Sequence, residues 1–154
     1  MQVVEYSEKY KQDFIDFNTA WIIDNFGSLE KEDIDTFENI EKKLSEGAMI
    51  YFAVDGKDTL ATCMAAPMEN GTWEICKLGS NKYCSHKGAG SAVFKAAMDW
   101  AVNHGATRLF ILSNSKLKPA LHIYKKFGFT EIKLDDYEYV RGDIAFEYIV
   151  PKSQ

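Results

Sequence analysis

The chain has 154 residues and a formal net charge of −5, which is enough length for about one domain around a single hydrophobic core. Hydrophobic residues make up 46% and charged residues 27%, values that are typical of a folded soluble protein and that argue against a disordered chain. General nucleic-acid binding relies on basic residues that neutralise phosphates, so no nucleic-acid partner is predicted for this acidic chain. The same acidity suits a basic or amine substrate. We therefore predict one domain over residues 1–154.

Cysteine usage and the absence of long apolar runs indicate where the protein works. The three cysteines, Cys63, Cys76 and Cys84, form no C-x-x-C motif, which predicts reduced thiols and a cytoplasmic location. Residues 1–10 are polar and lack the apolar core of a signal peptide. No run approaches the ~18 apolar residues of a membrane-spanning helix, so no membrane association is predicted. The three histidines form no ligand pattern with the cysteines, and no metal is predicted.

Local patterning predicts a mixed α/β fold. Short runs bounded by Asp-Gly and Asn-Gly turns indicate strands, and apolar residues at three- and four-residue spacing indicate helices. In chain order the predicted elements are a strand at 3–6, helices at 10–26 and 29–45, strands at 49–54, 59–67 and 72–78, a polar loop at 79–88, a helix at 89–104, a strand at 108–112, a helix at 119–127, and strands at 129–132 and 145–149. Early hairpins and a central strand–helix–strand crossover predict a mixed, mostly antiparallel sheet with helices on both faces.

A glycine-rich segment, 85–91, lies between a predicted strand and a predicted helix and reads Ser-His-Lys-Gly-Ala-Gly-Ser. Glycines let the backbone turn tightly and approach a ligand closely. Free amides at a helix N-terminus favour an anion, and Lys87 adds positive charge. The segment therefore predicts a cradle for phosphate or pyrophosphate, with an ordinary strand–helix turn as the structural alternative.

Two nucleotide-binding motifs fit the chain poorly. A P-loop needs Gly-Lys followed by Ser or Thr, whereas Gly56-Lys57 is followed by Asp58. A dinucleotide-binding fingerprint needs a third glycine where Val93 stands, and an acidic residue ~20 positions later. A nucleotide-dependent kinase or oxidoreductase is therefore disfavoured, and an acyl-CoA pyrophosphate loop is the remaining interpretation.

Two motifs in order resemble the signatures of the GNAT superfamily of N-acetyltransferases. The first is Trp-Glu-Ile-Cys-Lys-Leu-Gly-Ser at 73–80, followed by the glycine-rich segment. The second runs over 114–129 and ends in Tyr-x-x-x-Gly-Phe. The resemblance covers residues 49–149 and extends more loosely to the two leading helices. It implies a GNAT-like acyl-CoA N-acyltransferase fold, acetyl-CoA as co-substrate and no metal.

The resemblance also implies which residues hold the cofactor. The family loop reads Gln/Arg-x-x-Gly-x-Gly/Ala, whereas here Ser85 stands first and His86 replaces a frequent glycine. Such loops hold pyrophosphate largely through backbone amides, the strand at 72–80 aligns the pantetheine arm, and Asn114 contacts that arm, with a turn role for Asn114 as the alternative. The implied cofactor-binding residues are Leu78, Gly79, Ser80, Ser85, His86, Lys87, Gly88, Ala89, Gly90, Ser91, Asn114 and Leu117.

Tyr124 is the candidate general acid. Leu117, Ala120, Leu121 and Tyr124 are spaced i, i+3, i+4 and i+7, which places them on one helix face directed toward the sheet. A phenol with a pKa near 10 is protonated at neutral pH. In resembling enzymes a tyrosine at this position faces the CoA sulfur, where it would protonate the leaving thiolate. A half-buried core aromatic is the alternative.

A base is also needed, because acyl transfer requires a neutral amine. Glu74 precedes the loop on its strand, where resembling enzymes often carry the base, and a solvated strand carboxylate is the alternative. Glu30 and Asp33 form an acidic pair that either clasps a cationic acceptor or is a solvated face. Cys76 and Cys84 flank the loop, and packing is favoured over nucleophilic chemistry for both.

Near the C-terminus, Tyr137 and Tyr139 with Arg141 and Asp143 are interpreted as an acceptor-side or homodimer surface, with ordinary strand packing as the alternative. Taken together, the residues predict acetyl transfer from acetyl-CoA to a primary amine of a small molecule or peptide by direct attack. A non-catalytic acyl-CoA-binding or sensing domain is the alternative function.

Overall fold

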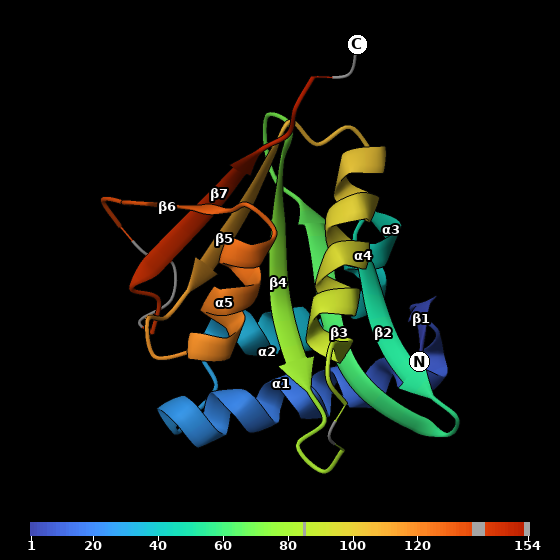
Figure 1. The fold of residues 1–154 in the computed structure, drawn as a ribbon. Coiled ribbons are helices and arrows are strands. Elements are labelled where there is room, and N and C mark those ends of the chain that lie inside the picture. Colours follow the sequence, from blue (N-terminus) through green and yellow to red (C-terminus); the bar gives the residue numbers. More distant parts are fainter. Residues whose placement is uncertain (85, 137–140, 153–154) are drawn as a thin grey trace.

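The computed structural model describes residues 1–84, 86–136 and 141–152, and its centre is a seven-stranded β-sheet (Figure 1). The strands lie in the order β1-β2-β3-β4-β5-β7-β6. Their bounds are β1 Gln2–Glu5, β2 Met49–Asp55, β3 Asp58–Pro67, β4 Thr72–Ser80, β5 Arg108–Ser113, β6 Thr130–Ile132 and β7 Ile144–Ile149. β4 and β5 pair in parallel, and the other neighbours pair antiparallel. The predicted mixed, mostly antiparallel sheet is confirmed.

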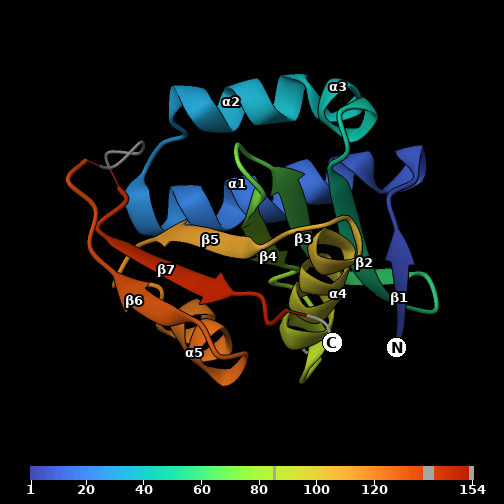
Figure 2. The same ribbon diagram turned by 90° about the horizontal axis from the view of Figure 1, so that it is seen from above.

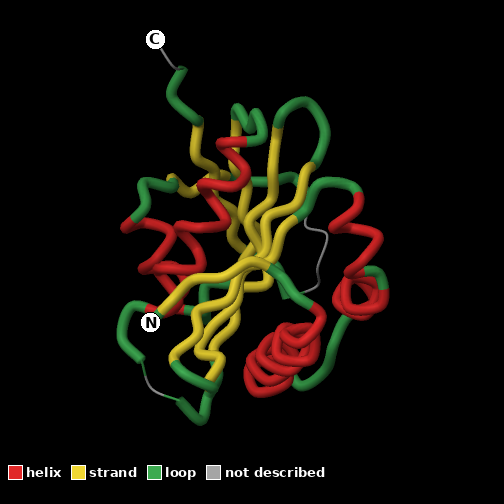
Figure 3. Tube along the Cα trace, turned by 90° about the vertical axis from the view of Figure 1, so that its right-hand side faces the viewer, coloured by secondary structure: helices red, strands yellow, loops and turns green. Residues whose placement is uncertain are grey.

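Helices cover both faces of the sheet, as predicted. Helices α1, α2 and α3 lie on one face, and α4 and α5 lie on the other (Figure 2). Seen toward an edge, the strands form a twisted layer between the two groups of helices (Figure 3). The helix bounds are η1 Glu8–Tyr10 (a short 3-10 turn), α1 Lys11–Phe26, α2 Lys31–Glu38, α3 Ile40–Ser45, α4 Ala89–Asn103 and α5 Lys118–Lys126.

The region 29–45, predicted as one helix, is two helices. The break lies at Asn39, whose φ is −124° and whose backbone amide donates to the carbonyl of Thr36 at 3.2 Å. The Asn39 side-chain amide donates to the carbonyl of Asp35 at 2.8 Å, which is the acceptor that a continuing helix would need. Because this side chain competes with the backbone for that carbonyl, the helix ends and a second one starts.

Two hydrophobic cores hold the helices on the sheet. Beneath α4 and α5, the ring of Phe94 lies 5.6 Å from the rings of both Tyr124 and Phe129. Beneath α1 to α3, Phe14 meets Phe37 edge to face at 5.9 Å. Burial of one phenylalanine contributes about 1.5–3 kcal/mol, so both faces are firmly anchored. The sheet is therefore fixed between two packed layers.

The centre of the sheet opens between β4 and β5. The two strands pair over 72–74 and 108–110 and then diverge (Figure 1). On its other side β4 bulges, because residues 76–79 face residues 62–64 of β3. Within the bulge Lys77 has φ +54°, a backbone conformation that a side chain makes unfavourable. The bulge and the divergence together place a gap beside the second half of β4.

Candidate active site

A cavity of about 450 Å³ occupies the gap between β4 and β5. Residues from α1 and from the segment before β7 line one side, and residues from α4 and α5 line the other, so the cavity passes through the plane of the sheet. It brings together both predicted catalytic residues and six of the predicted cofactor-binding residues. The lining residues include Trp21, Asn25, Glu74, Cys76, Lys77, Leu78, Gly79, Ser80, Gly90, Phe94, Ser113, Asn114, Leu117, Tyr124 and Arg141.

Tyr124 lies in the wall of this cavity and is 6% exposed. Its ring packs against Phe94 at 5.6 Å and Phe146 at 5.4 Å, and its hydroxyl is 3.5 Å from the hydroxyl of Ser113 at the end of β5. Burial raises the pKa of Tyr124 to about 12, although the contact with Ser113 acts in the opposite direction. The phenol is therefore protonated at neutral pH, and Tyr124 lines a space that a substrate can enter.

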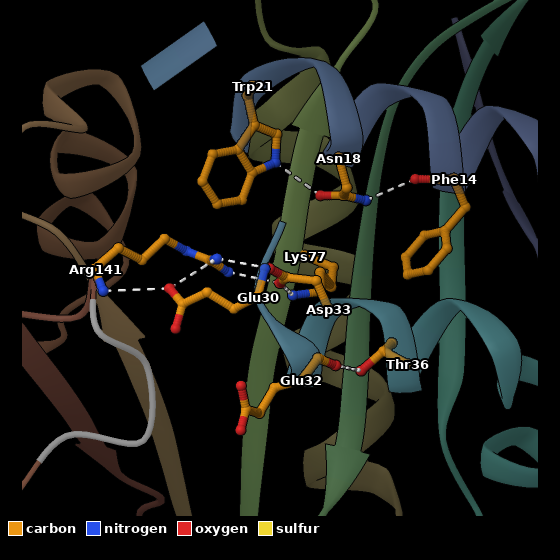
Figure 4. Close-up of polar contacts among 9 residues, drawn as sticks. All are labelled: Phe14, Asn18, Trp21, Glu30, Glu32, Asp33, Thr36, Lys77 and Arg141. Carbon is orange, nitrogen blue, oxygen red and sulfur yellow. Dashed lines mark hydrogen bonds and ion pairs between the residues drawn. The ribbon is translucent and has the colours of Figure 1, made fainter. Parts of the chain in front are cut away.

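The second half of β4 forms the opposite wall. Gly79 and Ser80, predicted to start a loop, belong to the strand. A Cβ on Gly79 would lie 3.0 Å from Oδ1 of Asn18, so a glycine there lets α1 approach β4 closely. Asn18 is fully buried, and its Oδ1 accepts a hydrogen bond from Nε1 of Trp21 at 2.8 Å (Figure 4). This contact fixes the Trp21 ring at the cavity wall.

The glycine-rich segment leads into α4. Gly88 has φ +91° at the N-cap of α4, a conformation that glycine adopts readily. Gly90 lines the cavity, and a Cβ there would lie 3.3 Å from Cδ1 of Ile123 on α5. His86 and Lys87 are exposed, Ala89 is buried at the first position of the helix, and Lys126 donates to the Ser91 hydroxyl at 3.2 Å. Ser85 lies outside the described residues.

The other predicted residues occupy distinct places around the cavity. Asn114 accepts a hydrogen bond from the Lys116 amide at 2.8 Å and donates to the carbonyl of Arg141, so it closes the turn before α5. Leu117 is the N-cap of α5. Glu74 is half-buried on β4 and pairs with β5 at the last register position before the strands diverge. All three line the cavity.

The acidic pair formed by Asp33 on α2 and Glu30 at its N-cap has a role that the sequence analysis did not foresee. Asp33 is fully buried and forms ion pairs with Lys77 at 2.6 Å and Arg141 at 2.6 Å, while Glu30 pairs with Arg141 at 3.3 Å (Figure 4). Burial alone would raise the pKa of Asp33, but hydrogen bonds from Arg141 and the charge of Lys77 lower it to about 2. Asp33 is thus neither a solvated charge nor an open clasp for an acceptor.

For the cysteines, the structure favours a packing role over a role as nucleophiles. Cys76 lines the cavity, but burial raises the pKa of its thiol well above the usual value, and nearby Glu74 raises it further. Burial likewise raises the pKa of the Cys63 thiol. Because the thiolate is the reactive form, both are poor nucleophiles at neutral pH. All three cysteines are free.

Two negative findings apply to the residues that the structure describes. They contain no group of three or more His, Cys, Asp or Glu side chains arranged to hold a metal ion. Within the described ranges, no helix combines the length and apolar character needed to cross a membrane.

The C-terminal stripe is only partly described, because Tyr137 and Tyr139 lie outside the described residues. Of its other two members, Arg141 lines the cavity, and the Asp143 carboxylate accepts hydrogen bonds from the amide and the hydroxyl of Ser115 at 2.8 Å. Arg141 is therefore adjacent to the candidate site, and Asp143 fixes the turn after β5.

Sequence reasoning missed four residues at this site: Asn18, Trp21, Lys77 and Ser113. Asn18 stands on an otherwise apolar helix face, a local signal that could have singled it out. The positions of Trp21, Lys77 and Ser113 depend on segments that are distant in the chain. No local pattern therefore pointed to them.

The chain matches the family model of the acetyltransferase (GNAT) family over residues 10–129. It therefore belongs to the GNAT acetyltransferase family, and the predicted GNAT-like fold is confirmed. No curated protein sequence matches the chain.

Solved structures agree with this assignment at the level of the fold. A GNAT-family acetyltransferase from Staphylococcus aureus MU50 has a TM-score of 0.84 and 18% identity, covering 96% of this chain and 98% of its own. The yncA protein of Salmonella typhimurium, solved with its cofactor acetyl-CoA, has a TM-score of 0.80 and 9% identity, covering 99% and 95%. The paia N-acetyltransferase of Thermoplasma acidophilum, in complex with coenzyme A, has a TM-score of 0.73 and 13% identity, covering 97% and 100%.

Proposed function

We propose that this protein is a single cytoplasmic N-acetyltransferase domain spanning 1–154, which transfers the acetyl group of acetyl-CoA to a primary amine of a small molecule or peptide. One observation carries the proposal: Tyr124 is buried in the wall of a cavity that passes between β4 and β5. Because burial raises the pKa of Tyr124 to about 12, its phenol is neutral at pH 7. A buried neutral phenol beside an open cavity is a proton donor placed to meet a substrate. In thioester chemistry the group that needs this proton is the departing sulfur.

The reaction proceeds by direct attack. The neutral amine nitrogen bonds to the carbonyl carbon of the thioester, and the carbon–sulfur bond then breaks. The sulfur takes the proton of Tyr124, and the nitrogen loses one proton to Glu74, directly or through a water. The products are the acetylated amine and free CoA. The phenolate of Tyr124 recovers its proton through Glu74 or solvent, which closes the cycle.

The high pKa of Tyr124 is compatible with this role. Burial disfavours the phenolate, but it disfavours a thiolate in the same cavity for the same reason. The thiol of Cys76, which also lines the cavity, shifts in the same direction, because burial raises its pKa well above the usual value. The sulfur that leaves CoA would experience a comparable environment. Its affinity for a proton therefore rises along with that of Tyr124.

The donor side of the cavity offers fitting partners for acetyl-CoA. We propose that amides of the α4 N-terminus, with Gly88 and Gly90, hold the pyrophosphate and that Lys87 adds charge attraction. The pantetheine arm would run along β4, where backbone amides over 78–80 polarise the thioester carbonyl. No step in this scheme needs a metal ion.

An activity screen tests the proposal directly. The purified chain is incubated with acetyl-CoA and a panel of amines, including amino acids, polyamines and short peptides, and release of free CoA thiol is followed. We expect amine-dependent thiol release with at least one acceptor, and mass spectrometry should find one acetyl group added to that acceptor. Hydrolysis of acetyl-CoA without amine is the background control.

Ligand binding separates this proposal from the other interpretations. Thermal unfolding is compared with acetyl-CoA, ATP and NAD, because a ligand that binds only the folded state raises the Tm. We expect stabilisation by acetyl-CoA alone. Stabilisation by acetyl-CoA without transfer to any amine would favour a sensing domain. Stabilisation by ATP or NAD alone would overturn the proposal.

A further inference from the structure

One buried carboxylate joins two walls of the cavity without lining it. Oδ1 of Asp33, on α2, accepts hydrogen bonds from Nζ of Lys77 at 2.6 Å and from one terminal nitrogen of Arg141 at 2.6 Å. Its Oδ2 accepts from the other terminal nitrogen of Arg141 at 2.7 Å (Figure 4). Lys77 and Arg141 both line the cavity, and Asp33 lies behind them. Three elements that are distant in the chain thus meet at one side chain.

The Lys77 branch acts on the β4 bulge. Lys77 has φ +54°, which a residue with a Cβ adopts only when its surroundings impose it. Its side chain is buried and is held by the ion pair to Asp33 and by the ring of Phe37, 5.9 Å from Nζ. The pair therefore fixes the strand just before residues 78–80, the backbone that faces the cavity.

The Arg141 branch acts on the part of the cavity wall next to α1. The guanidinium meets Asp33 with both terminal nitrogens, a geometry that fixes orientation as well as distance. It also lies 5.6 Å from the ring of Trp21, and its carbonyl accepts a hydrogen bond from Asn114. Trp21 and Arg141 consequently form one rigid surface on the α1 side of the cavity.

We propose that Asp33 is a positioning residue for acetyl transfer, a role that rests on the proposed function above. Through Lys77 it holds the β4 bulge against the thioester. Through Arg141 it holds the surface against which the amine packs. Asp33 touches neither reactant, so the two branches should affect different kinetic constants.

Three substitutions separate the branches. Asp33→Asn keeps the shape of the side chain but removes the charge. Lys77→Met removes the ion pair from Asp33 to β4 and keeps the one to Arg141, and Arg141→Met removes the ion pair to the α1 side and keeps the one to Lys77. Glu38→Gln, an exposed change on the same helix, is the matched control. Each variant is assayed for kcat and acceptor KM with the best amine of the screen. Acetyl-CoA Kd is measured by calorimetry, and folding by circular dichroism.

Small displacements of reacting groups cost large factors in rate, so the expected effects are clear. Lys77→Met should lower kcat roughly tenfold or more with little change in acceptor KM. Arg141→Met should raise acceptor KM roughly tenfold with little change in kcat. Asp33→Asn should do both. Acetyl-CoA Kd of Arg141→Met should stay near the wild-type value, because Arg141 lies outside β4, in the segment before β7, and Glu38→Gln should match wild type in kcat, KM and Kd.

A network that serves stability alone would lower the Tm of the variants but leave kcat and KM of the folded protein at wild-type values, and that result overturns the inference. If Asp33→Asn does not fold, the split between Lys77→Met and Arg141→Met decides the question in the same way. A wild-type protein that binds acetyl-CoA but acetylates no amine would overturn the proposed function, and this inference with it. An active wild type with unaltered variants overturns this inference alone.

Discussion

The two sides of the cavity are built from different chemistry. On the α4 and α5 side, Tyr124 and Phe94 belong to a continuous apolar core, and the only polar contact of the Tyr124 phenol that the described residues show is to Ser113. On the α1 and α2 side, the buried carboxylate of Asp33 meets the cations of Lys77 and Arg141. The first side holds the phenol of Tyr124 in its neutral form, and the second side holds the carboxylate of Asp33 in its ionised form.

This contrast shows how one cavity can serve two tasks. Tyr124 must carry its proton in order to donate it. An apolar core keeps the phenol protonated, because burial disfavours the charged phenolate. A wall made of segments that are distant in the chain needs strong, directional links, and charge-assisted hydrogen bonds supply them. The predictions below test each side of the comparison, from the largest expected effect to the smallest.

The largest effect should come from removing the ionised centre. Asp33→Asn removes the buried carboxylate that pairs with both Lys77 and Arg141 and should lower the free energy of unfolding by about 3–5 kcal/mol. Because the pKa of Asp33 falls from 3.8 to about 2 on folding, the ionisation contributes about 2 kcal/mol. The contribution of the Asp33 ionisation to stability is complete above about pH 5 and is lost as pH falls through about 2. Chemical unfolding of both proteins at several pH values measures it.

The difference in the free energy of unfolding between wild type and Asp33→Asn should therefore be constant from about pH 5 to 8 and should become smaller below about pH 4. Glu38→Gln supplies the exposed control on α2 and should change stability by less than about 0.5 kcal/mol. If this difference in the free energy of unfolding does not change in acid, the ion pairs of Asp33 are not its source.

The second effect concerns the end of the cavity where we propose that acetyl-CoA binds. Gly90→Val places a branched side chain against Ile123 at the cavity wall, where even a Cβ would lie at 3.3 Å. We expect acetyl-CoA affinity to fall roughly 30-fold or more, a loss of about 2 kcal/mol, with the fold intact by circular dichroism. Ala96→Val, further along α4, is the control. Normal calorimetric affinity in a folded Gly90→Val protein would place the cofactor elsewhere.

The third effect tests the neutral side. Tyr124→Phe removes one oxygen and keeps the ring, so packing should barely change while kcat falls roughly tenfold and acetyl-CoA affinity stays near wild type. Tyr148→Phe, a half-buried tyrosine on β7, should leave kcat unaltered. Wild-type turnover in Tyr124→Phe would make Tyr124 a core aromatic only.

The pH profile sharpens the same test. An acid must carry its proton to act, so turnover falls only as pH rises through its pKa. With the pKa of Tyr124 at about 12, no loss of turnover from its deprotonation is expected between about pH 7 and 10. A loss within that range that is absent from Tyr124→Phe would show that the phenol ionises more easily than its buried position allows.

The smallest effect belongs to the exposed loop. Lys87 is solvated, so its attraction to the phosphates should be screened by salt. Lys87→Ala should weaken acetyl-CoA binding only about two- to fivefold and should flatten the salt dependence of Kd. Lys57→Ala, in the β2–β3 turn, is the control. An unchanged salt slope would show that Lys87 does not face the pyrophosphate.

Local patterns predicted the elements of the fold well, and the exceptions have physical causes. The 3.6-residue spacing of apolar residues placed α1, α4 and α5 within two residues of their observed bounds. The break at Asn39 was missed because it depends on one side chain that takes a backbone acceptor within its own helix. The end of β4 was placed two residues early, since Gly79 and Ser80 favour loops by composition while their strand pairing is decided by β3.

The sequence by itself determined the family, the sheet with helices on both faces, and the position of Tyr124 on the inner face of α5, because these depend on short motifs and helical periodicity. Only the tertiary structure decided that Asp33, Lys77 and Arg141 share one buried contact. Lys77 and Arg141 are 44 and 108 positions from Asp33 along the chain, and the local sequence around Asp33 allowed a solvated charge as readily as a buried one. Burial and ion pairing decide whether a charged residue is solvated or forms part of the core. Both depend on segments that are distant in the chain, so no local window of sequence contains them.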